Sequence, residues 1–171
     1  DEERRIEKVL KEWEKRTRDL ARELERVNRE HKKTSEDVLK KLEEINREVR
    51  RVVKEENLPE DALRELEKRL EEDHERIERE FRKDKKRLEE DHRRVREEVE
   101  RSRKKLEELR RRVKDVEKLR RLIEEVIRED ERRVERVKRN NKRLSEETEK
   151  LVEDVRRNNE RLVKEVRDRS R

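Results

Sequence analysis

The sequence contains no cysteine, glycine, methionine or tyrosine, and only one proline, one tryptophan and one phenylalanine. Without cysteine there is no disulfide, no thiolate nucleophile and no thiolate metal ligand. Compact α/β and all-β domains need glycine and proline in their turns, and aromatic or β-branched runs in their strands. These absences leave three classes of chain: a disordered polyampholyte, a single charged helix and a helical bundle.

What the chain does contain is charge, which makes up 64% of its 171 residues against 25% hydrophobic residues. The 58 basic and 52 acidic residues are interleaved, and the net charge is only +6. Nucleic-acid-binding proteins more often concentrate basic residues in a stripe or block. No apolar run approaches the roughly 20 residues of a membrane span. We therefore expect a solvated helix surface with many ion pairs, and neither a nucleic-acid nor a membrane partner.

Apolar residues recur three and four positions apart, as one face of a helix requires. A longer repeat also runs through the chain, since the segment RLEEDH at 69–74 reappears at 87–92. Eighteen residues in five turns equal the 3.6 residues per turn of an undistorted helix, whereas a heptad repeat imposes a left-handed supercoil. The repeat therefore predicts long, nearly straight helices.

Two breaks divide this pattern. In the segment 56–61, Asn57 suits a left-handed helix end and Pro59 suits the first turn of a new helix. Near Lys114 the apolar stripe slips by one residue, and Asp115 is a plausible N-cap. The chain is therefore predicted to be all-α, a single antiparallel up-down-up three-helix bundle domain over residues 1–171. Its helices are expected at about 2–56, 59–113 and 116–170.

In such a bundle, residue x of the first helix faces about 115 − x on the second helix and 114 + x on the third. This register places polar residues of the three core faces in common layers. A buried polar group without a partner costs about 1–3 kcal/mol, so residues in one layer are expected to hydrogen-bond to each other. The predicted structural network comprises Asn28, His31, Thr34, Ser35, Asn46, Asp73, His74, Asp84, Asp91, His92, Asn140, Asn141, Ser145, Thr148, Asn158 and Asn159.

A resemblance in construction rests on the repeated pairs Asn28/Asn46 and His74/His92 and on a surface of mainly Glu, Lys and Arg. The chain resembles de novo, parametrically designed straight helical bundles with buried hydrogen-bond networks. The resemblance covers the whole chain and implies a structural scaffold with no evolved activity. The chain departs from that style by having no glycine in its loops. A spectrin-like structural protein is an alternative, since those three-helix repeats often carry a tryptophan like Trp13, but they follow heptads.

A metal site is the first functional alternative, because three histidines lie on core faces. The register separates His92, His31 and His74 by roughly 12–15 Å along the axis, whereas Zn²⁺ needs ligand atoms about 2.0–2.2 Å from one point. Glu71 and Glu89 each precede a histidine by three residues, but both motifs lie on the second helix at different heights. We expect no metal and no cofactor.

Catalysis is the second alternative, because His31, Asp84 and Ser145 share a layer and are the residue types of a catalytic triad. A triad also needs a serine exposed to substrate, an oxyanion hole and a cleft. A narrow three-helix core offers no cleft, and there is no glycine-rich loop to supply backbone donors. The prediction is therefore a buried polar layer, not an enzyme, with no small-molecule ligand.

Self-association is the serious rival to a monomer. The first and third predicted helices carry wider apolar faces, either because they pack closely together or because they form an interface between copies. The low apolar content favours a monomer, with a homo-oligomer as the alternative. The paired apolar positions are Val9–Leu10, Leu20–Ala21, Val52–Val53, Leu122–Ile123 and Val126–Ile127.

Three smaller expectations remain. Trp13 is expected to fill an end layer, with its indole N–H reaching Ser102. If His74 and His92 accept hydrogen bonds from asparagines, mild acid would disrupt those contacts. The N-terminal DEER segment does not resemble a signal peptide, and the sequence indicates no cellular location beyond an expectation of solubility.

Overall fold

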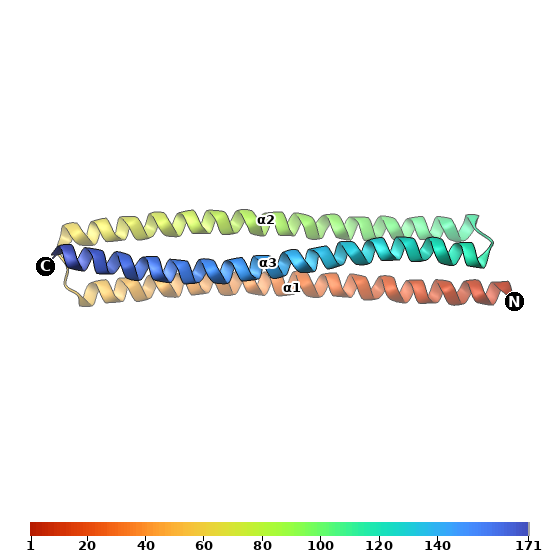
Figure 1. Cartoon of the computed structure of the whole chain (residues 1–171), viewed down its shortest axis with the longest axis horizontal. Coiled ribbons are helices and arrows are strands. Elements are labelled where there is room, and N and C mark those ends of the chain that lie inside the picture. The colour runs from red at the N-terminus through yellow and green to blue at the C-terminus, as the bar shows by residue number, and fades with distance from the viewer. Residues whose placement is uncertain (171) are drawn as a thin grey trace. The chain divides into compact units, whose positions relative to one another are not determined.

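The structure is a computed structural model that describes residues 1–170. It consists of three helices, α1 (Glu2–Glu55), α2 (Glu60–Arg112) and α3 (Val116–Ser170), and no strand occurs among the described residues (Figure 1). The chain is therefore an all-α three-helix bundle, as the apolar repeat predicts. Each helix end lies within one residue of its expected position.

The first turn is built as its residues predict. Asn57 has a φ of 55°, the left-handed conformation that asparagine tolerates better than most other non-glycine residues. The amide of Glu56 donates to the carbonyl of Val52 at 3.0 Å and closes α1. The carbonyl of Pro59 accepts from the amide of Leu63 at 3.0 Å, so Pro59 lies just before α2.

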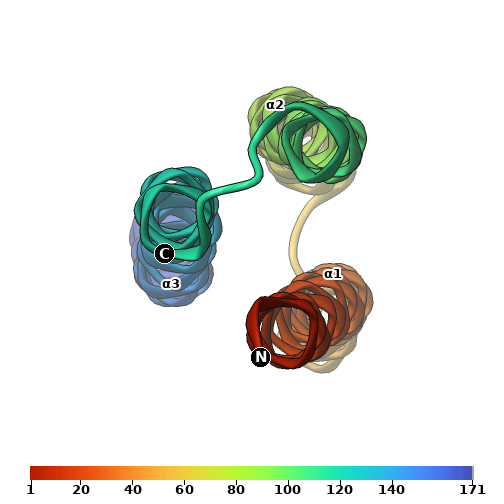
Figure 2. The same cartoon turned by 90° about the vertical axis from the view of Figure 1, so that its right-hand side faces the viewer.

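The second turn occupies residues 113–115 (Figure 2). The carboxylate Oδ1 of Asp115 accepts a hydrogen bond from the backbone amide of Glu117 at 3.0 Å. This contact satisfies one of the amides that the first turn of a helix leaves without an intrahelical partner. Asp115 is thus the N-cap of α3, and the phase slip in the sequence marks a true chain reversal.

The residues group into two compact units, each containing a segment of all three helices. The first unit contains residues 1–30 and 87–142, and the second contains residues 31–86 and the chain from 143 onward. A single domain over residues 1–171 stays a prediction.

The core of the first unit fixes the direction of α1 and α2. One apolar cluster contains Leu10 of α1 and Leu106 of α2, and a second contains Leu24 and Val95. Residue numbers therefore rise along α1 while they fall along α2, which makes these segments antiparallel. Apolar burial of about 25 cal/mol per Å² is the main force that holds them together.

The α3 segments run parallel to α1. In the first unit, Leu119 lies in the cluster of Leu10, and Val134 lies in the cluster of Leu24. The two apolar clusters of the second unit show the same order, with residue numbers rising on α1 and α3 and falling on α2. Each unit is thus an up-down-up arrangement of helices around two apolar clusters.

Most residues of the wider apolar faces of α1 and α3 are buried or half-buried within the two units. Val52 and Leu122 are half-buried and Ala21 is exposed. No large hydrophobic residue is exposed anywhere in residues 1–170. The other paired positions are buried: Val9, Leu10, Leu20, Val53, Ile123, Val126 and Ile127.

Candidate functional site

A buried hydrogen bond between side chains of α2 and α3 lies in the first unit. The Ser102 hydroxyl of α2 donates to Asp130 Oδ1 of α3 at 3.1 Å, and Arg133 Nη1 donates to the same oxygen at 2.9 Å. Arg133 Nε lies 2.6 Å from Glu98 Oε2 of α2. Asp130 is only 4% exposed and Ser102 is 8% exposed. These four residues, hereafter the Ser102–Asp130 cluster, join α2 to α3.

Burial dominates the electrostatics of Asp130. Desolvation raises the pKa of its carboxyl above the ordinary 3.8, and the hydrogen bonds from Ser102 and Arg133 oppose that rise. The neighbouring charge of Glu129 raises the pKa further. The folded chain therefore holds a carboxylate where water would solvate it better, which makes its two donors structurally important.

The predicted network does not include the Ser102–Asp130 cluster, although a sequence signal for it exists. Asp130 lies one sequence repeat before Thr148, and Ser102 lies one repeat after Asp84. Thr148 and Asp84 belong to the predicted network, so extending their rows by one repeat would have found the pair. The ion pair with Arg133 follows from its position three residues after Asp130 on one helix face.

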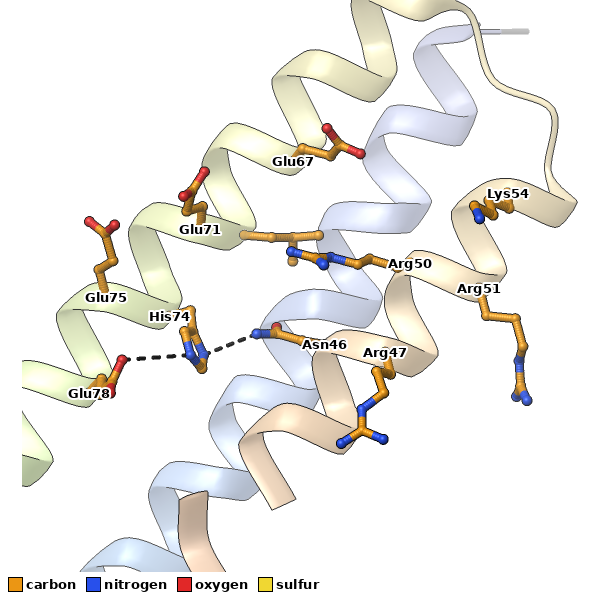
Figure 3. Close-up of a pocket in the computed structure, with 11 residues that line it drawn as sticks. Asn46, Arg47, Arg50, Arg51, Lys54, Glu67, Glu71, His74, Glu75 and Glu78 are labelled. Carbon is orange, nitrogen blue, oxygen red and sulfur yellow. Dashed lines mark hydrogen bonds and ion pairs between the residues drawn. The ribbon is translucent and has the colours of Figure 1, made fainter. Parts of the chain in front are cut away.

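In the second unit, the structure brings together two predicted residues, Asn46 of α1 and His74 of α2. Asn46 Nδ2 donates to His74 Nδ1 at 3.0 Å (Figure 3). An amide nitrogen can only donate, so His74 Nδ1 is the acceptor, and the other ring nitrogen, Nε2, lies 3.8 Å from Glu78 Oε2. His74 and Asn46 are half-buried. This contact links α1 and α2.

A second pair of predicted residues meets in the first unit. Asn140 Nδ2 of α3 donates to Asp91 Oδ2 of α2 at 3.3 Å. Asp91, His92, Asn140 and Asn141 were expected in one layer as an 18-residue copy of the layer of Asn46 and His74. The Asn140–Asp91 bond joins α3 to α2, whereas the Asn46–His74 bond joins α1 to α2.

Two hydroxyl groups of the network, those of Ser35 and Thr148, bond within their own helices. Ser35 Oγ donates to the carbonyl of His31 at 2.9 Å, and Thr148 Oγ1 donates to the carbonyl of Ser145 at 2.9 Å. A serine or threonine hydroxyl readily reaches the carbonyl three or four residues earlier on its helix. These side chains are buried, yet these bonds do not link helices.

The other predicted residues are distributed over several degrees of burial. His31, His92 and Asn159 are buried. Asp73 is half-buried and pairs with Arg76 of its own helix at 3.4 Å. Asn158 is exposed. Half-buried positions without a hydrogen bond from their side chains to another described residue are Asn28, Thr34, Asp84, Asn141 and Ser145.

Inter-helix ion pairs converge on α3. Arg16 of α1 donates to Glu124 at 2.6 Å and to Glu131 at 2.7 Å, both on α3. The hydrogen bond to Glu131 raises the pKa of Arg16, with Glu124 adding to the rise and burial opposing it. Lys138 of α3 pairs with Glu23 of α1. Arg69 and Arg169 complete the set with Glu165 and Glu65, so these inter-helix ion pairs all have one partner on α3.

Trp13 fills a layer near the end of the first unit, in the cluster that contains Leu106 and Leu119. The expected contact from its indole to Ser102 is wrong, because Trp13 Nε1 bonds to no described residue, and the Ser102 hydroxyl donates to Asp130. Trp13 Nε1 is buried without a hydrogen-bond partner among the described residues. The carboxylate of Asp130 is a charge-assisted acceptor for the Ser102 hydroxyl, which accounts for the side to which Ser102 is bonded.

Two absences in residues 1–170 concern other classes of function. No group of three or more His, Cys, Asp or Glu side chains in this part of the chain is arranged to hold a metal ion. None of the described helices combines the length and apolar character needed to cross a membrane.

No protein-family model, curated protein or solved structure matches the chain. Its interpretation therefore rests on its own residues and geometry.

Proposed function

We propose that the chain is a designed structural scaffold whose buried polar contacts specify the register of its helices. The observation that carries this proposal is the Ser102–Asp130 cluster, in which a nearly inaccessible carboxylate receives a hydroxyl donor from a neighbouring helix. The 18-residue repeat and the charged surface without exposed large hydrophobic residues support the same interpretation.

Register specification follows from the cost of a slip. Moving α2 past α3 by one helical turn, about 5.4 Å, would take Ser102 away from Asp130. The carboxylate would then be buried with fewer donors, at a cost of about 1–3 kcal/mol for each hydrogen bond that is broken. Apolar layers alone distinguish the correct register from a slipped register less well, because leucine and valine in neighbouring turns have similar shapes. The polar cluster therefore contributes more to uniqueness than to stability.

The experiment measures register directly, and the cysteine-free chain makes site-specific labelling simple. Spin labels on cysteines replacing the exposed Lys104 of α2 and Glu125 of α3 report their distance within the first unit. In the parent chain we expect one narrow distance distribution. In the double variant Ser102→Val and Asp130→Leu we expect a broader or second distance with equal or higher thermal stability.

The matched control is Leu106→Met, which changes the same core without removing a polar contact and should leave the distribution narrow. A distribution that stays equally narrow in the double variant would contradict register specification by the cluster.

A self-associating scaffold built on apolar contacts is the second candidate, and the burial of the paired apolar residues within the units argues against it. Light scattering coupled to size exclusion at moderate salt tests the point. We expect a mass near the 21.7 kDa of one chain. A stable dimer or trimer that persists at high salt would favour an apolar interface between copies.

A further inference from the structure

A groove of about 930 Å³ lies between α1 and α2 in the second unit. Asn46 and His74 lie at one end of it, and Leu70 forms part of its apolar lining. A smaller groove of about 330 Å³ shares Leu70 and Glu67 with it and extends to the first turn. The surface between α1 and α2 is therefore hollow over several helical turns.

The two walls of this groove carry opposite charge (Figure 3). On α1, residues at relative positions 0, 3, 4 and 7 form a basic row on one helix face. On α2, residues at relative positions 0, 4, 8 and 11 form an acidic row. All are exposed except the half-buried Glu78. The basic row is Arg47, Arg50, Arg51 and Lys54, and the acidic row is Glu67, Glu71, Glu75 and Glu78.

These charges do not pair across the groove. Arg47 pairs with Glu43 of its own helix, and Glu78 pairs with Arg82 of its own helix. The other six side chains of the two rows form no ion pair within residues 1–170. Ion pairs bridge α3 to α1 and to α2, whereas none joins α1 to α2 among the described residues that line this groove.

We propose that this groove is a weak, salt-sensitive docking surface for a second copy of the chain, in a parallel two-fold dimer. The two rows line the same groove and overlap along it, because the Asn46–His74 contact places Arg47–Lys54 beside residues 66–73, while Glu75 and Glu78 extend beyond Asn46. A rotation of 180° about an axis parallel to the helices at the groove mouth places the α1 of each copy over the α2 of the other. Each basic row then meets the partner's acidic row, which makes the surface complementary to itself.

The alternative two-fold axis, perpendicular to the helices, places α1 over α1 and like charges over each other. Only the parallel arrangement is electrostatically favourable. Because no large hydrophobic residue is exposed in residues 1–170, charge is the main source of affinity, and the association is expected to be weak. It is independent of the scaffold role and of the Ser102–Asp130 cluster.

The first test is the mass of the whole chain as a function of salt, by sedimentation equilibrium. The screening length is about 30 Å at 0.01 M and about 10 Å at 0.1 M ionic strength, so surface ion pairs weaken over this range. We expect mass above the monomer value at about 0.01 M salt, and an association constant at least about tenfold lower at 0.1 M. A monomer at every salt concentration would overturn the proposal, because the rows would then not attract a second copy.

Charge exchange gives the sharper test, using row members that have no ion pair. The acidic variant carries Arg50→Glu, Arg51→Glu and Lys54→Glu, and the basic variant carries Lys at three of the four positions of the acidic row. Each variant alone presents two rows of one sign and should be a monomer at low salt. A 1:1 mixture should form a heterodimer tighter than the parent homodimer. The basic variant is Glu67→Lys, Glu71→Lys and Glu75→Lys.

The matched control separates the groove from net charge. Arg143→Glu, Lys150→Glu and Arg161→Glu change the charge of exposed α3 positions by the same amount as the acidic variant. This control should still self-associate like the parent and should not form the tight heterodimer with the basic variant. Equal association of the basic variant with the control and with the acidic variant would overturn the docking site. Circular dichroism of each variant verifies that it is folded.

Orientation is read from a single spin label at the exposed Lys40 of α1. In a parallel dimer the two labels lie at the same height. In the perpendicular arrangement, centred on the groove near residue 50, they are about 30 Å apart along the axis. A measured label-to-label distance that includes this axial separation of about 30 Å would contradict the parallel geometry.

Discussion

Ser102 and Asp130 are 28 residues apart in the sequence and are joined by a buried hydrogen bond of 3.1 Å between α2 and α3. The bond holds a carboxylate in a position that is 4% exposed. Since burial raises the pKa of Asp130, the folded chain binds a proton at this site more tightly than the unfolded chain does.

The first prediction is a pH dependence of stability. A raised pKa in the folded state adds stability as pH falls through that pKa, and the gain is complete below the ordinary value of 3.8. Asp130→Asn removes the titrating group and keeps an acceptor for Ser102. The unfolding free energy of the parent should therefore rise relative to that of Asp130→Asn as pH falls from 7 to about 3.5. Denaturant titrations at each pH measure the difference, and parallel curves would contradict the assignment.

The second prediction compares two asparagines that lie one sequence repeat apart on α1. Asn46 donates to His74, whereas Asn28 makes no hydrogen bond from its side chain within the described chain. Both are half-buried. Asn46→Ala should lower the unfolding free energy by about 0.5–1.5 kcal/mol, and Asn28→Ala by less than about 0.5 kcal/mol. Chemical denaturation at neutral pH tests both, and equal losses would mean that the 3.0 Å contact contributes nothing specific.

The third prediction concerns the first turn. Asn57 has a φ of 55°, a region where a Cβ atom costs roughly 1–2 kcal/mol for most residues. Asn57→Ala should lower the unfolding free energy by about 1 kcal/mol, while Asn57→Gly should not lower it. Thermal melts of the two variants check that the glycine variant is more stable than the alanine variant. A glycine variant less stable than the alanine variant would show that this conformation is not what the turn requires.

The fourth prediction tests the N-cap of α3. Asp115→Ala removes the acceptor of the Glu117 amide and should cost about 1 kcal/mol of unfolding free energy. Asp115→Asn keeps an oxygen acceptor and should retain most of the stability. If alanine and asparagine variants are equally destabilised, the loss comes from the charge near the helix start and not from the cap.

The fifth prediction concerns the orphaned indole nitrogen of Trp13. Trp13→Phe removes a buried donor that has no partner among residues 1–170, which offsets part of the lost ring volume. We expect a change in unfolding free energy within about 1 kcal/mol. Trp13→Ala should cost about 3–5 kcal/mol because it leaves a cavity. A large loss in the phenylalanine variant would indicate that the indole N–H is bonded in solution.

Local signals in the sequence were sufficient for the helices and turns. The conformation of Asn57, the capping role of Asp115 and the helix ends depend mainly on residues within a few positions along the chain. The spacing of apolar residues reports which face of each helix is buried, and a reversal after each break follows from the short turns. Short-range stereochemistry and apolar periodicity therefore predict the all-α three-helix fold.

The polar contacts depended on information that spacing does not contain. Layers were predicted from height alone, but a hydrogen bond also requires the rotation of each helix and the reach of each side chain. Ser35 and Thr148 satisfy their hydroxyls on their own helices, and Asn28 and Asn46 differ although they share a row. A choice between a local and a cross-helix partner is decided by distances of about 1 Å, which the sequence pattern does not resolve.

By itself, the sequence determined where the helices begin and end, which faces are apolar and where the chain turns, because these depend on local backbone preferences and on the 18-residue repeat. Only the tertiary structure decided which polar residues of a repeat row bond across helices, as Ser102 does to Asp130, and that no ion pair crosses the α1–α2 groove among its described residues. Both depend on how three helices are rotated against each other, and that rotation is set by the packing of all their side chains at once.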